Sequence, residues 1–358
     1  MLTGQQRILI VRIGAMGDVL HAMPAVAALR KMHPQCWIGW AVEPRWLPLL
    51  KAVSAETGMA LVNETFVAAT KDWKRRPVSR RTFSEIAQLR RETRRGRFDL
   101  CVDMQGSIRS AVIGRMAGAR EFVGAADPRE APARWLYGRT ATTRSKHVIE
   151  QGCELLGTAV GAVLRPAPLD FPPDAAVERE CDALLERLLP GGERFALMAP
   201  TAGWGAKQWP AERFGAVAAK MGHRGYRTLI NAASEEDPIA RSVVAASEGY
   251  AAVAAGDLPL LIALTRRAEV VIAGDTGPLH LAAALRRPVV ALFGPTDPAR
   301  NGPYGTRAKV LRHGRERRDH RRLAEPEKGL LAITVEEVVE AAMELLTAGP
   351  STGSARSG

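Results

Sequence analysis

Short apolar runs rich in β-branched residues alternate with helical patterns along the first half of the chain. The apolar runs predict strands at residues 7–13, 37–43, 98–106 and 121–123. Helical spacing of apolar residues predicts helices at residues 19–32 and 110–117, with a loop at 14–17 after the first strand. Strands that are apolar on both faces and alternate with helices form parallel sheets. We therefore expect a doubly wound α/β domain in this half.

A second series of the same kind follows a proline-rich stretch at residues 166–174, which is typical of a linker between domains. Its predicted strands are residues 195–200, 226–232, 251–255 and the two strands within 270–298, and its predicted helices include 210–221 and 335–346. We therefore expect two Rossmann-like α/β domains, residues 1–170 and 175–348, with a cleft between them. Residues 349–358 are low in apolar side chains and are expected to be a disordered tail.

The turn after the predicted strand at 270–274 has the parts of an anion-binding site. It reads Asp275-Thr276-Gly277-Pro278, and His280 falls in the first turn of the following helix. Gly277 allows a ligand close to the backbone, and a helix N-terminus offers unpaired N–H groups and a partial positive charge that suit a diphosphate. The alternative is that Asp275 or Thr276 only caps the helix.

A glycine loop with an acidic residue follows the first predicted strand. Gly14 and Gly17 allow a tight turn at the carboxyl end of the strand, where α/β domains bind ligands. Asp18 comes next, at the start of a helix, and could act as a general base, although it could equally serve only as a helix cap. The loop reads G-x-x-G-D and not G-x-G-x-x-G, so a dinucleotide site with Glu43 on the ribose is the weaker interpretation.

Two further loops carry candidate ligand-binding residues. Small residues lead from the strand at 195–200 to Lys207, a combination that would suit a phosphate but also an ordinary surface loop. Residues 234–237, Ser-Glu-Glu-Asp, follow the next strand, and one carboxylate could accept ribose hydroxyl groups. Acidic residues at a helix N-terminus are the simpler explanation there.

Composition narrows the choice of function through charge. The net charge is +12, with basic clusters at residues 71–81, 90–97 and 312–322. Such clusters attract nucleic acid, anionic lipid or phosphorylated substrates, or simply form a solvated arginine-rich surface. No nucleic-acid-binding signature is present, and aromatic residues make up only 5%. No apolar run is long enough to span a membrane, and the N-terminus has no signal-peptide pattern. The four cysteines are scattered and lack the spacing of a metal site. We therefore expect the protein to work in a reducing, cytoplasmic environment.

Five motifs in order along the chain resemble the family-nine glycosyltransferases, the ADP-heptose:lipopolysaccharide heptosyltransferases. They are RIGAMGDVLHAMP (12–24), VDMQG (102–106), KQWP (207–210), DTGPLH (275–280) and FGPTDP (293–298). The resemblance covers about residues 7–346, and the ordered set is more specific than any single motif. MGDVLH and the Arg129-Glu130 pair look most like the heptosyltransferase I branch, which adds the first heptose to Kdo-lipid A.

The resemblance implies a GT-B fold, with the acceptor bound by the N-terminal domain and the nucleotide sugar by the C-terminal domain. It implies inverting transfer of heptose from ADP-heptose to the Kdo/lipid A inner core, with no cofactor or metal ion. Asp18 matches the family's proposed general base. The positions that match donor-binding residues are Thr201, Ala202, Lys207, Glu235, Asp275, Thr276, Gly277 and His280. The match is loose at Thr201 and Ala202, where the loop is one residue longer, and at Glu235, for which Ser234 is an alternative.

The resemblance also accounts for the charge. Lys71, Lys74, Arg75 and Arg129 match residues that contact the acidic acceptor, and residues 71–81 hold six basic residues against one acid. Kdo-lipid A carries carboxylates and phosphates and lies on an anionic leaflet, so these residues suit both the acceptor and the membrane surface. The expected location is cytoplasmic and peripheral at the inner face of the inner membrane, with no nucleic-acid partner.

Two alternatives stay open at this stage. One is a family-nine transferase with another nucleotide sugar or acceptor, because acceptor loops vary. The other, from a different class, is a non-catalytic basic protein that binds lipid or nucleic acid with a steep salt dependence. Retention of Asp18 and of the turn from Asp275 to His280 argues against the second.

Overall fold

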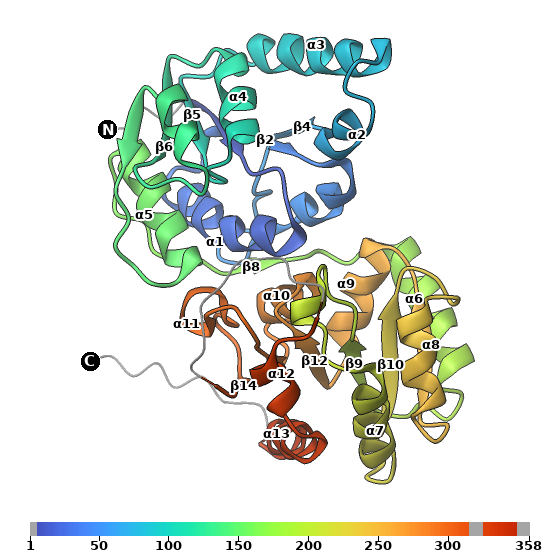
Figure 1. The fold of residues 1–358 in the computed structure, drawn as a ribbon. Helices are drawn as coiled ribbons and strands as arrows, with labels where there is room; N and C mark the ends of the chain where they lie inside the picture. The colour runs from blue at the N-terminus through green and yellow to red at the C-terminus, as the bar shows by residue number, and fades with distance from the viewer. Residues whose placement is uncertain (1–5, 315–324, 349–358) are drawn as a thin grey trace. The chain divides into compact units, whose positions relative to one another are not determined.

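Two six-stranded parallel sheets, one in each half of the chain, organise the fold of the computed structural model (Figure 1). The structure describes residues 6–314 and 325–348. By its internal contacts the chain divides into unit 1, Met1–Pro172, and unit 2, Pro173–Gly358. The boundary falls inside the proline-rich stretch. The expected tail at 349–358 and residues 315–322 of the third basic cluster lie outside the described residues.

Unit 1 is a doubly wound domain with strand order β4-β2-β1-β5-β6-β7. Its strands are β1 (Arg7–Val11), β2 (Trp37–Val42), β4 (Glu64–Val67), β5 (Leu100–Asp103), β6 (Glu121–Ala125) and β7 (Arg139–Ala141), and a two-stranded antiparallel pair is formed by β3 (Val53–Ser54) and β8 (Leu169–Asp170). Its helices are α1 (Met16–Met32), α2 (Thr70–Arg75), α3 (Arg80–Arg95), α4 (Ile108–Ala117) and α5 (Val148–Val160), with 3-10 turns η1 (Pro44–Lys51) and η2 (Ala131–Leu136). Helices α1 and α5 pack together, as do α3 and α4.

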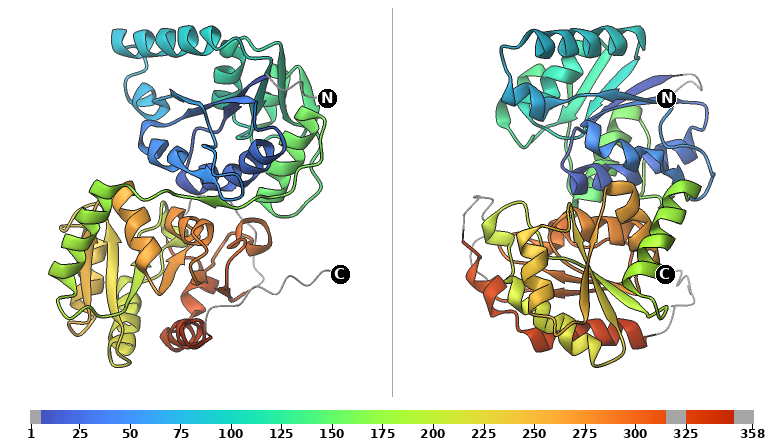
Figure 2. Two further views of the ribbon diagram at one scale, coloured as in Figure 1. Left: turned by 180° about the vertical axis from the view of Figure 1, so that it is seen from behind. Right: turned by 90° about the vertical axis from the view of Figure 1, so that its right-hand side faces the viewer.

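Unit 2 repeats this plan with strand order β11-β10-β9-β12-β13-β14. Its strands are β9 (Phe195–Ala199), β10 (Arg227–Ala232), β11 (Ala251–Ala255), β12 (Val270–Gly274), β13 (Val289–Leu292) and β14 (Ala308–Leu311). Its helices are α6 (Ala175–Leu188), α7 (Ala211–Gly222), α8 (Pro238–Ala245), α9 (Leu258–Arg267), α10 (Gly277–Ala284), α11 (Pro298–Asn301), α12 (Lys328–Ala332) and α13 (Val335–Thr347), with the turn η3 (Gly205–Lys207). Figure 2 shows this sheet with helices on both of its faces.

The predicted fold class is confirmed, because the central strands pair in parallel and are buried. β1 pairs with β2 and β5, and β9 pairs with β10 and β12. Val11 lies opposite Asp103 in unit 1, and Ala273 lies opposite Ala199 in unit 2. Each unit has its own apolar core, built from the strand faces and the helices that cover them. A separate core in each half is what allows each half to fold as a domain.

The structure corrects the predicted boundary of the first helix. Residues 14–17 were expected to form a loop, but α1 begins at Met16, so Gly17 lies in its first turn. The reason is local, because the Asp18 carboxylate accepts a hydrogen bond from the Ala15 N–H and caps a helix that starts earlier. The strand predicted at 98–106 is also shorter, since β5 covers only Leu100–Asp103.

Several helices were not predicted. The arginine-rich stretch at residues 90–97 was noted only for its charge, yet most of it belongs to α3, where Leu89 and Thr93 face the core. Charge dominated that sequence pattern and concealed its narrow buried face. No helix within residues 6–314 and 325–348 is long and apolar enough to cross a bilayer.

Candidate functional site

The candidate residues of each unit gather at the carboxyl ends of its parallel strands. In unit 1 the strand order reverses between β1 and β5, and in unit 2 it reverses between β9 and β12. Asp18 follows β1, whereas Lys207 follows β9 and Asp275 follows β12. Open α/β sheets bind ligands at this switch point, where the loops of adjacent strands diverge. Both units therefore present their most reactive candidate side chains at the position that their topology favours for a ligand.

Arg12 fixes the orientation of Asp18. Its Nη2 donates to Oδ1 of Asp18 at 3.0 Å, and its Nε donates to the Asp18 carbonyl at 2.9 Å. The other carboxylate oxygen accepts the Ala15 N–H at 3.0 Å. The Asp18 side chain nevertheless remains 33% exposed. Since a carboxylate oxygen can accept more than one hydrogen bond, Asp18 is held in one orientation and is still able to accept a proton.

Gln105, which was not singled out from the sequence except as part of a motif, holds the glycine loop. Its Oε1 accepts the N–H groups of Ile13 at 2.7 Å and Gly14 at 3.3 Å. A Cβ added at Gly14 would lie 2.5 Å from Nε1 of Trp46, so the loop passes too close to the indole for any larger residue. The loop that leads to Asp18 is therefore fixed from both sides.

A buried carboxylate organises the second loop at this switch point. Asp103 accepts the N–H groups of Gln105 and Gly106 and the hydroxyl groups of Ser110 and Tyr137, at 2.8–3.2 Å. Burial raises the pKa of Asp103, and these four hydrogen bonds act in the opposite direction. In this way the VDMQG motif uses Asp103 to shape the turn that places Gln105.

The predicted acceptor-binding residues are exposed, and they follow β4 and β6 of the unit 1 sheet. Lys71, Lys74 and Arg75 belong to α2, whose first turn is held by the buried Glu43 through Thr70 and the Lys71 N–H. Glu43 is thus occupied in anchoring α2, which removes the residue needed for a dinucleotide site. The backbone N–H of Arg129 lies close to Gly106, so Arg129 is brought to the loop that follows β5.

Three polar side chains, Lys207, Asp275 and His280, form the centre of the candidate site in unit 2. Nζ of Lys207 makes an ion pair with Oδ2 of Asp275 and also donates to its carbonyl oxygen at 3.2 Å. Nε2 of His280 lies 3.1 Å from Oδ1 of Asp275. All three side chains are largely buried. Burial by itself raises the pKa of Asp275, but His280 and Lys207 outweigh it and hold that pKa well below its usual range.

The N-terminus of α10 adds backbone donors beside this cluster. Thr276 is the N-cap, Gly277 the first helical residue and Pro278 the second. No side chain caps the helix, and the Thr276 hydroxyl donates weakly to the Gly274 carbonyl at 3.3 Å. The capping interpretation of Asp275 and Thr276 is therefore wrong. An uncapped helix N-terminus beside a lysine is a suitable site for a diphosphate.

Gln208 shapes the loop that holds Thr201 and Ala202. Its Oε1 accepts the Ala202 N–H at 2.9 Å, and its Nε2 donates to the Pro200 carbonyl at 2.6 Å. Trp209 is buried, and its Nε1 donates to the Ile333 carbonyl. The glutamine and tryptophan of the KQWP motif are thus structural, and they position Lys207, whose Nζ also lies 5.2 Å from the centroid of the Trp204 ring.

Glu235 differs from the other candidates because it is not drawn into the cluster. It is exposed and pairs with Arg187 at 3.1 Å. It does follow β10, and therefore lies at the same edge of the sheet as the cluster. A contact with a nucleoside is compatible with that position, and Glu235 stays a prediction.

Thr296 is a polar residue that the sequence did not single out. It lies in the GPTDP loop after β13, and its side chain is buried. Its Oγ1 has no hydrogen-bond partner among the described residues. In the sequence this threonine stands out only as part of the FGPTDP motif. Its burial depends on the tertiary structure and could not be inferred from the sequence.

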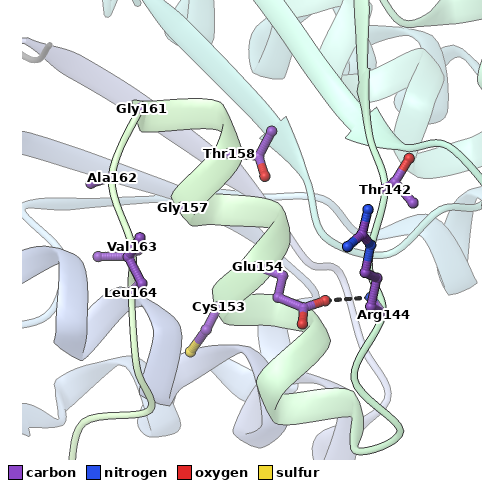
Figure 3. Close-up of a pocket in the computed structure, with 10 residues that line it drawn as sticks. All are labelled: Thr142, Arg144, Cys153, Glu154, Gly157, Thr158, Gly161, Ala162, Val163 and Leu164. Atoms are coloured by element: carbon purple, nitrogen blue, oxygen red, sulfur yellow. Dashed lines mark hydrogen bonds between the residues drawn. The ribbon is translucent and has the colours of Figure 1, made fainter.

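A separate cavity of about 480 Å³ in unit 1 contains none of the predicted site residues (Figure 3). It lies along the C-terminal half of α5, and Glu154 on its wall accepts the Arg144 N–H and the Ser145 hydroxyl. Burial raises the pKa of Cys153 to about 12, so its thiol stays protonated and is a poor nucleophile. This cavity offers no convergent set of reactive groups.

Within the parts of the chain that the structure describes, no group of three or more His, Cys, Asp or Glu side chains is placed to hold a metal ion. The groups of the unit 2 site that can donate hydrogen bonds to an anion are Lys207, His280 and the backbone N–H groups at the start of α10. A phosphate bound there would accept hydrogen bonds from these groups, which would stabilise its negative charge.

Comparison with known proteins agrees with this geometry. A family model described as "Glycosyltransferase family 9 (heptosyltransferase)" matches residues 86–330. Lipopolysaccharide heptosyltransferase 1 of Escherichia coli K12 is 27% identical over 318 residues, which cover 87% of this chain and 94% of that protein. The protein of the same name from Pseudomonas aeruginosa is 26% identical, over 84% of this chain and 81% of its own length.

Solved structures show the same fold. The structure titled "E. coli heptosyltransferase WaaC with ADP" has a TM-score of 0.74 and 24% identity, and the match covers 95% of this chain and all of that one. A family 9 glycosyltransferase from Veillonella parvula has a TM-score of 0.79 and 22% identity, over 97% of this chain and 98% of its own. The chain therefore has the GT-B fold of two Rossmann-like units.

Proposed function

The chain belongs to glycosyltransferase family 9, and from this premise we propose that it transfers heptose from ADP-heptose to the Kdo/lipid A inner core of lipopolysaccharide. Unit 2 binds the nucleotide sugar and unit 1 binds the acceptor. Relatives named heptosyltransferase 1 cover 84–87% of this chain at 26–27% identity, which supports this assignment over other sugars.

One observation carries the proposal: the candidate reactive groups of each unit lie at the switch point of its sheet. In unit 1, the partly exposed carboxylate of Asp18 follows β1. In unit 2, Lys207 follows β9, and the uncapped N-terminus of α10 follows the neighbouring strand β12. A transferase needs a base for the acceptor hydroxyl and positive groups for the departing diphosphate. The two units supply one of these each.

Asp18 is the general base in this proposal. Arg12 and the Ala15 N–H fix its carboxylate, which takes the proton from the attacking acceptor hydroxyl. Attack on the face of the sugar opposite the ADP would invert the anomeric carbon in a single displacement. A carboxylate that is already oriented loses little entropy when the reaction occurs.

Lys207, His280 and the N-terminus of α10 bind the ADP diphosphate and the donor sugar. Two of the three N–H groups of Lys207 are directed to Asp275, which leaves the third for a phosphate oxygen. The diphosphate gains negative charge as the bond to the sugar breaks, so these groups stabilise the transition state more than the ground state. Asp275 acts mainly by holding Lys207 and His280 in place, with Thr276 and Gly277 shaping the helix start.

Thr201, Ala202 and Glu235 complete the nucleotide side of the site. Lys71, Lys74, Arg75 and Arg129 bind the carboxylates and phosphates of the acceptor. Because that acceptor is anchored in a bilayer, the protein works as a peripheral protein at the cytoplasmic face of the inner membrane.

We expect the Asp18→Asn variant to lose transfer activity by a factor of about 10² to 10⁴, since general base catalysis contributes this much. ADP affinity should stay at the wild-type value because the nucleotide site belongs to the other unit. Glu56→Gln, at an exposed acid of unit 1 that pairs with Lys31 outside the proposed site, is the control and should turn over normally. Normal turnover in the Asp18 variant would remove that residue from the role of base.

The sugar and the acceptor are tested by incubating the protein with ADP-heptose and Kdo-lipid A and following the mass of the lipid. A gain of one heptose is expected. Parallel reactions with GDP- and UDP-sugars test the donor, and transfer from one of those alone would assign the protein to another branch of the family. Lack of any mass shift across several lipid A acceptors would overturn the proposed acceptor.

A further inference from the structure

Several large apolar side chains are exposed in the part of unit 1 that runs from the end of α2 to η2. Among the described residues, ten large apolar side chains are exposed, and five of them belong to the segments between α2 and the end of η2. These five form what we term the apolar surface: Val78, Phe83, Ile108, Val112 and Trp135. Val78 and Trp135 are each 85% exposed, and Phe83 is 60% exposed. Concentrated apolar exposure of this kind marks a contact surface.

The segments that carry the apolar surface are in contact with one another. α3 packs against α4 (Figure 1), and α4 also packs against η2. In the last turn of α3, Nε of Arg94 donates to the Met116 carbonyl of α4, and Phe83 lies about three turns earlier on the same side of α3. Ile108 and Val112 are one turn apart on the exposed face of α4.

The start of η2 is fixed beside the same helix. Oε2 of Glu130 accepts the Ile108 N–H at 2.9 Å. This bond places the segment that carries Trp135 next to the first turn of α4. The apolar surface is therefore carried by segments that contact one another in turn, α3 with α4 and α4 with η2.

Positive charge surrounds the apolar surface. Residues 71–117 contain thirteen Lys and Arg against five Asp and Glu, a surplus of eight in a chain whose net charge is +12. The charged residues of α4 are both basic, Arg109 and Arg115. Of the acids, Asp72 and Glu85 already pair with arginines and Asp103 is buried. The field around the apolar surface is therefore positive.

We propose that the apolar surface and the basic residues around it dock unit 1 onto an anionic bilayer. Apolar side chains that enter the headgroup region, with arginines that pair with anionic lipids, are the two contributions needed for binding at a membrane surface. A tryptophan is well suited to the boundary between water and lipid. This inference rests on the proposed function, since it explains how a water-exposed enzyme reaches an acceptor whose lipid is held in a membrane.

Other occupants fit the surface less well. Single-stranded nucleic acid requires a series of aromatic platforms, whereas three of the five apolar residues are aliphatic. The cores of protein interfaces are depleted in charged residues, and here arginines lie among the apolar side chains. A bilayer accepts both kinds of side chain over the same area.

The test is flotation of the full-length protein with vesicles of phosphatidylcholine alone or with about 30% phosphatidylglycerol. Binding is expected only with the anionic vesicles and should fall with added salt. The double variant Phe83→Ser/Trp135→Ser should bind about tenfold more weakly, because apolar insertion is lost. The matched control is Val163→Ser, whose side chain is 83% exposed at the end of α5 and which should bind like the wild type.

Melting temperatures of the variants are measured alongside, and both should match the wild type because the altered side chains are exposed. Equal vesicle binding by the double variant and the Val163→Ser control would overturn the proposal. So would binding to a short RNA or to a protein partner without binding to anionic vesicles.

Transfer assays separate this proposal from the proposed function. With an acceptor dispersed in detergent, the double variant should be as active as the wild type. With the same acceptor embedded in anionic vesicles, it should be about tenfold slower. Loss of transfer with intact vesicle binding would contradict the function alone, whereas transfer with no vesicle binding would contradict the docking surface alone.

Discussion

Asp275 is a carboxylate in a site that we propose for a diphosphate, and its neighbours explain why it is there. One of its oxygens pairs with Lys207 and the other accepts a hydrogen bond from His280, so the acid fixes the positions of both side chains. The acid orders a lysine that would otherwise sample many rotamers. In our proposal a negative residue thus contributes to anion binding by preorganising the hydrogen-bond donors around it.

We expect Asp275→Asn to destabilise unit 2 by about 3–5 kcal/mol at neutral pH, because breaking a buried ion pair leaves its partner charge uncompensated. The folded-state pKa of Asp275 lies below its unfolded value, so its stabilising contribution is complete above about pH 4 and is lost as the pH falls further. The difference in the free energy of unfolding between wild type and variant should therefore decrease below about pH 4. Denaturant unfolding at several pH values measures it.

Asp182→Asn is the matched control for this measurement. Asp182 pairs with Arg267 on the surface of the same unit, and exposed pairs contribute about 0–1 kcal/mol. A stability difference for Asp275→Asn that increased on acidification would show that the carboxylate is not held ionised by its neighbours.

At the scale of elements, the loops matter more than the helices and strands that carry them. The loop after β5 holds the loop after β1 through Gln105, whose partners Ile13 and Gly14 are more than ninety residues away in sequence. Asp18 comes only a few residues after those partners. The position of the proposed base thus depends on a contact between two strand-end loops.

Gln105→Leu should destabilise unit 1 by about 1–3 kcal/mol, because the Ile13 and Gly14 N–H groups lose their acceptor. It should also lower kcat at least tenfold, since the loop that leads to Asp18 is no longer fixed. Steady-state kinetics and denaturant unfolding measure the two effects. ADP affinity, a property of unit 2 in our proposal, should not change.

Gln105→Glu preserves an oxygen at the position of Oε1 and is expected to remain much closer to the wild type. If the Glu and Leu variants were impaired equally, the hydrogen bonds of Oε1 would not be the reason for the effect. Loss of packing around the side chain would then be the explanation.

At the scale of the whole molecule, the chain has two separate apolar cores, one in each unit. Ligand binding therefore stabilises the unit that holds the ligand. A ligand at 100 times its Kd raises the free energy of unfolding of that unit by about 2.7 kcal/mol. For a unit of this size the increase raises the melting temperature by about 5–10 °C.

We expect ADP to slow hydrogen exchange in β9, β12 and α10 and to leave β1 and β5 at their rates without ligand. Exchange measured by mass spectrometry resolves these segments. Lys207→Met should lose most of the protection because a phosphate contact is removed. Protection of β1 and β5 without protection of β12 would reverse the assignment of the nucleotide to unit 2.

The sequence by itself determined the fold class and most of the central strands. Apolar strands and amphipathic helices have periods of two and about 3.6 residues, and these periods are local properties of the chain. The positions of Asp18, Lys207 and Asp275 at the ends of strands followed from the same pattern. The ordered motifs indicated the family, which the family model confirms, and the GT-B fold, which solved structures share.

The tertiary structure alone decided which side chains meet. The pairing of Lys207 with Asp275, the support of the glycine loop by Gln105 and the contact of Trp46 with Gly14 all join segments far apart in the chain. Such contacts depend on strand order and register, which place two distant strand ends at one edge of a sheet. Local sequence patterns predict that a strand exists, but the neighbour beside which it ends is set by the packing of the whole domain.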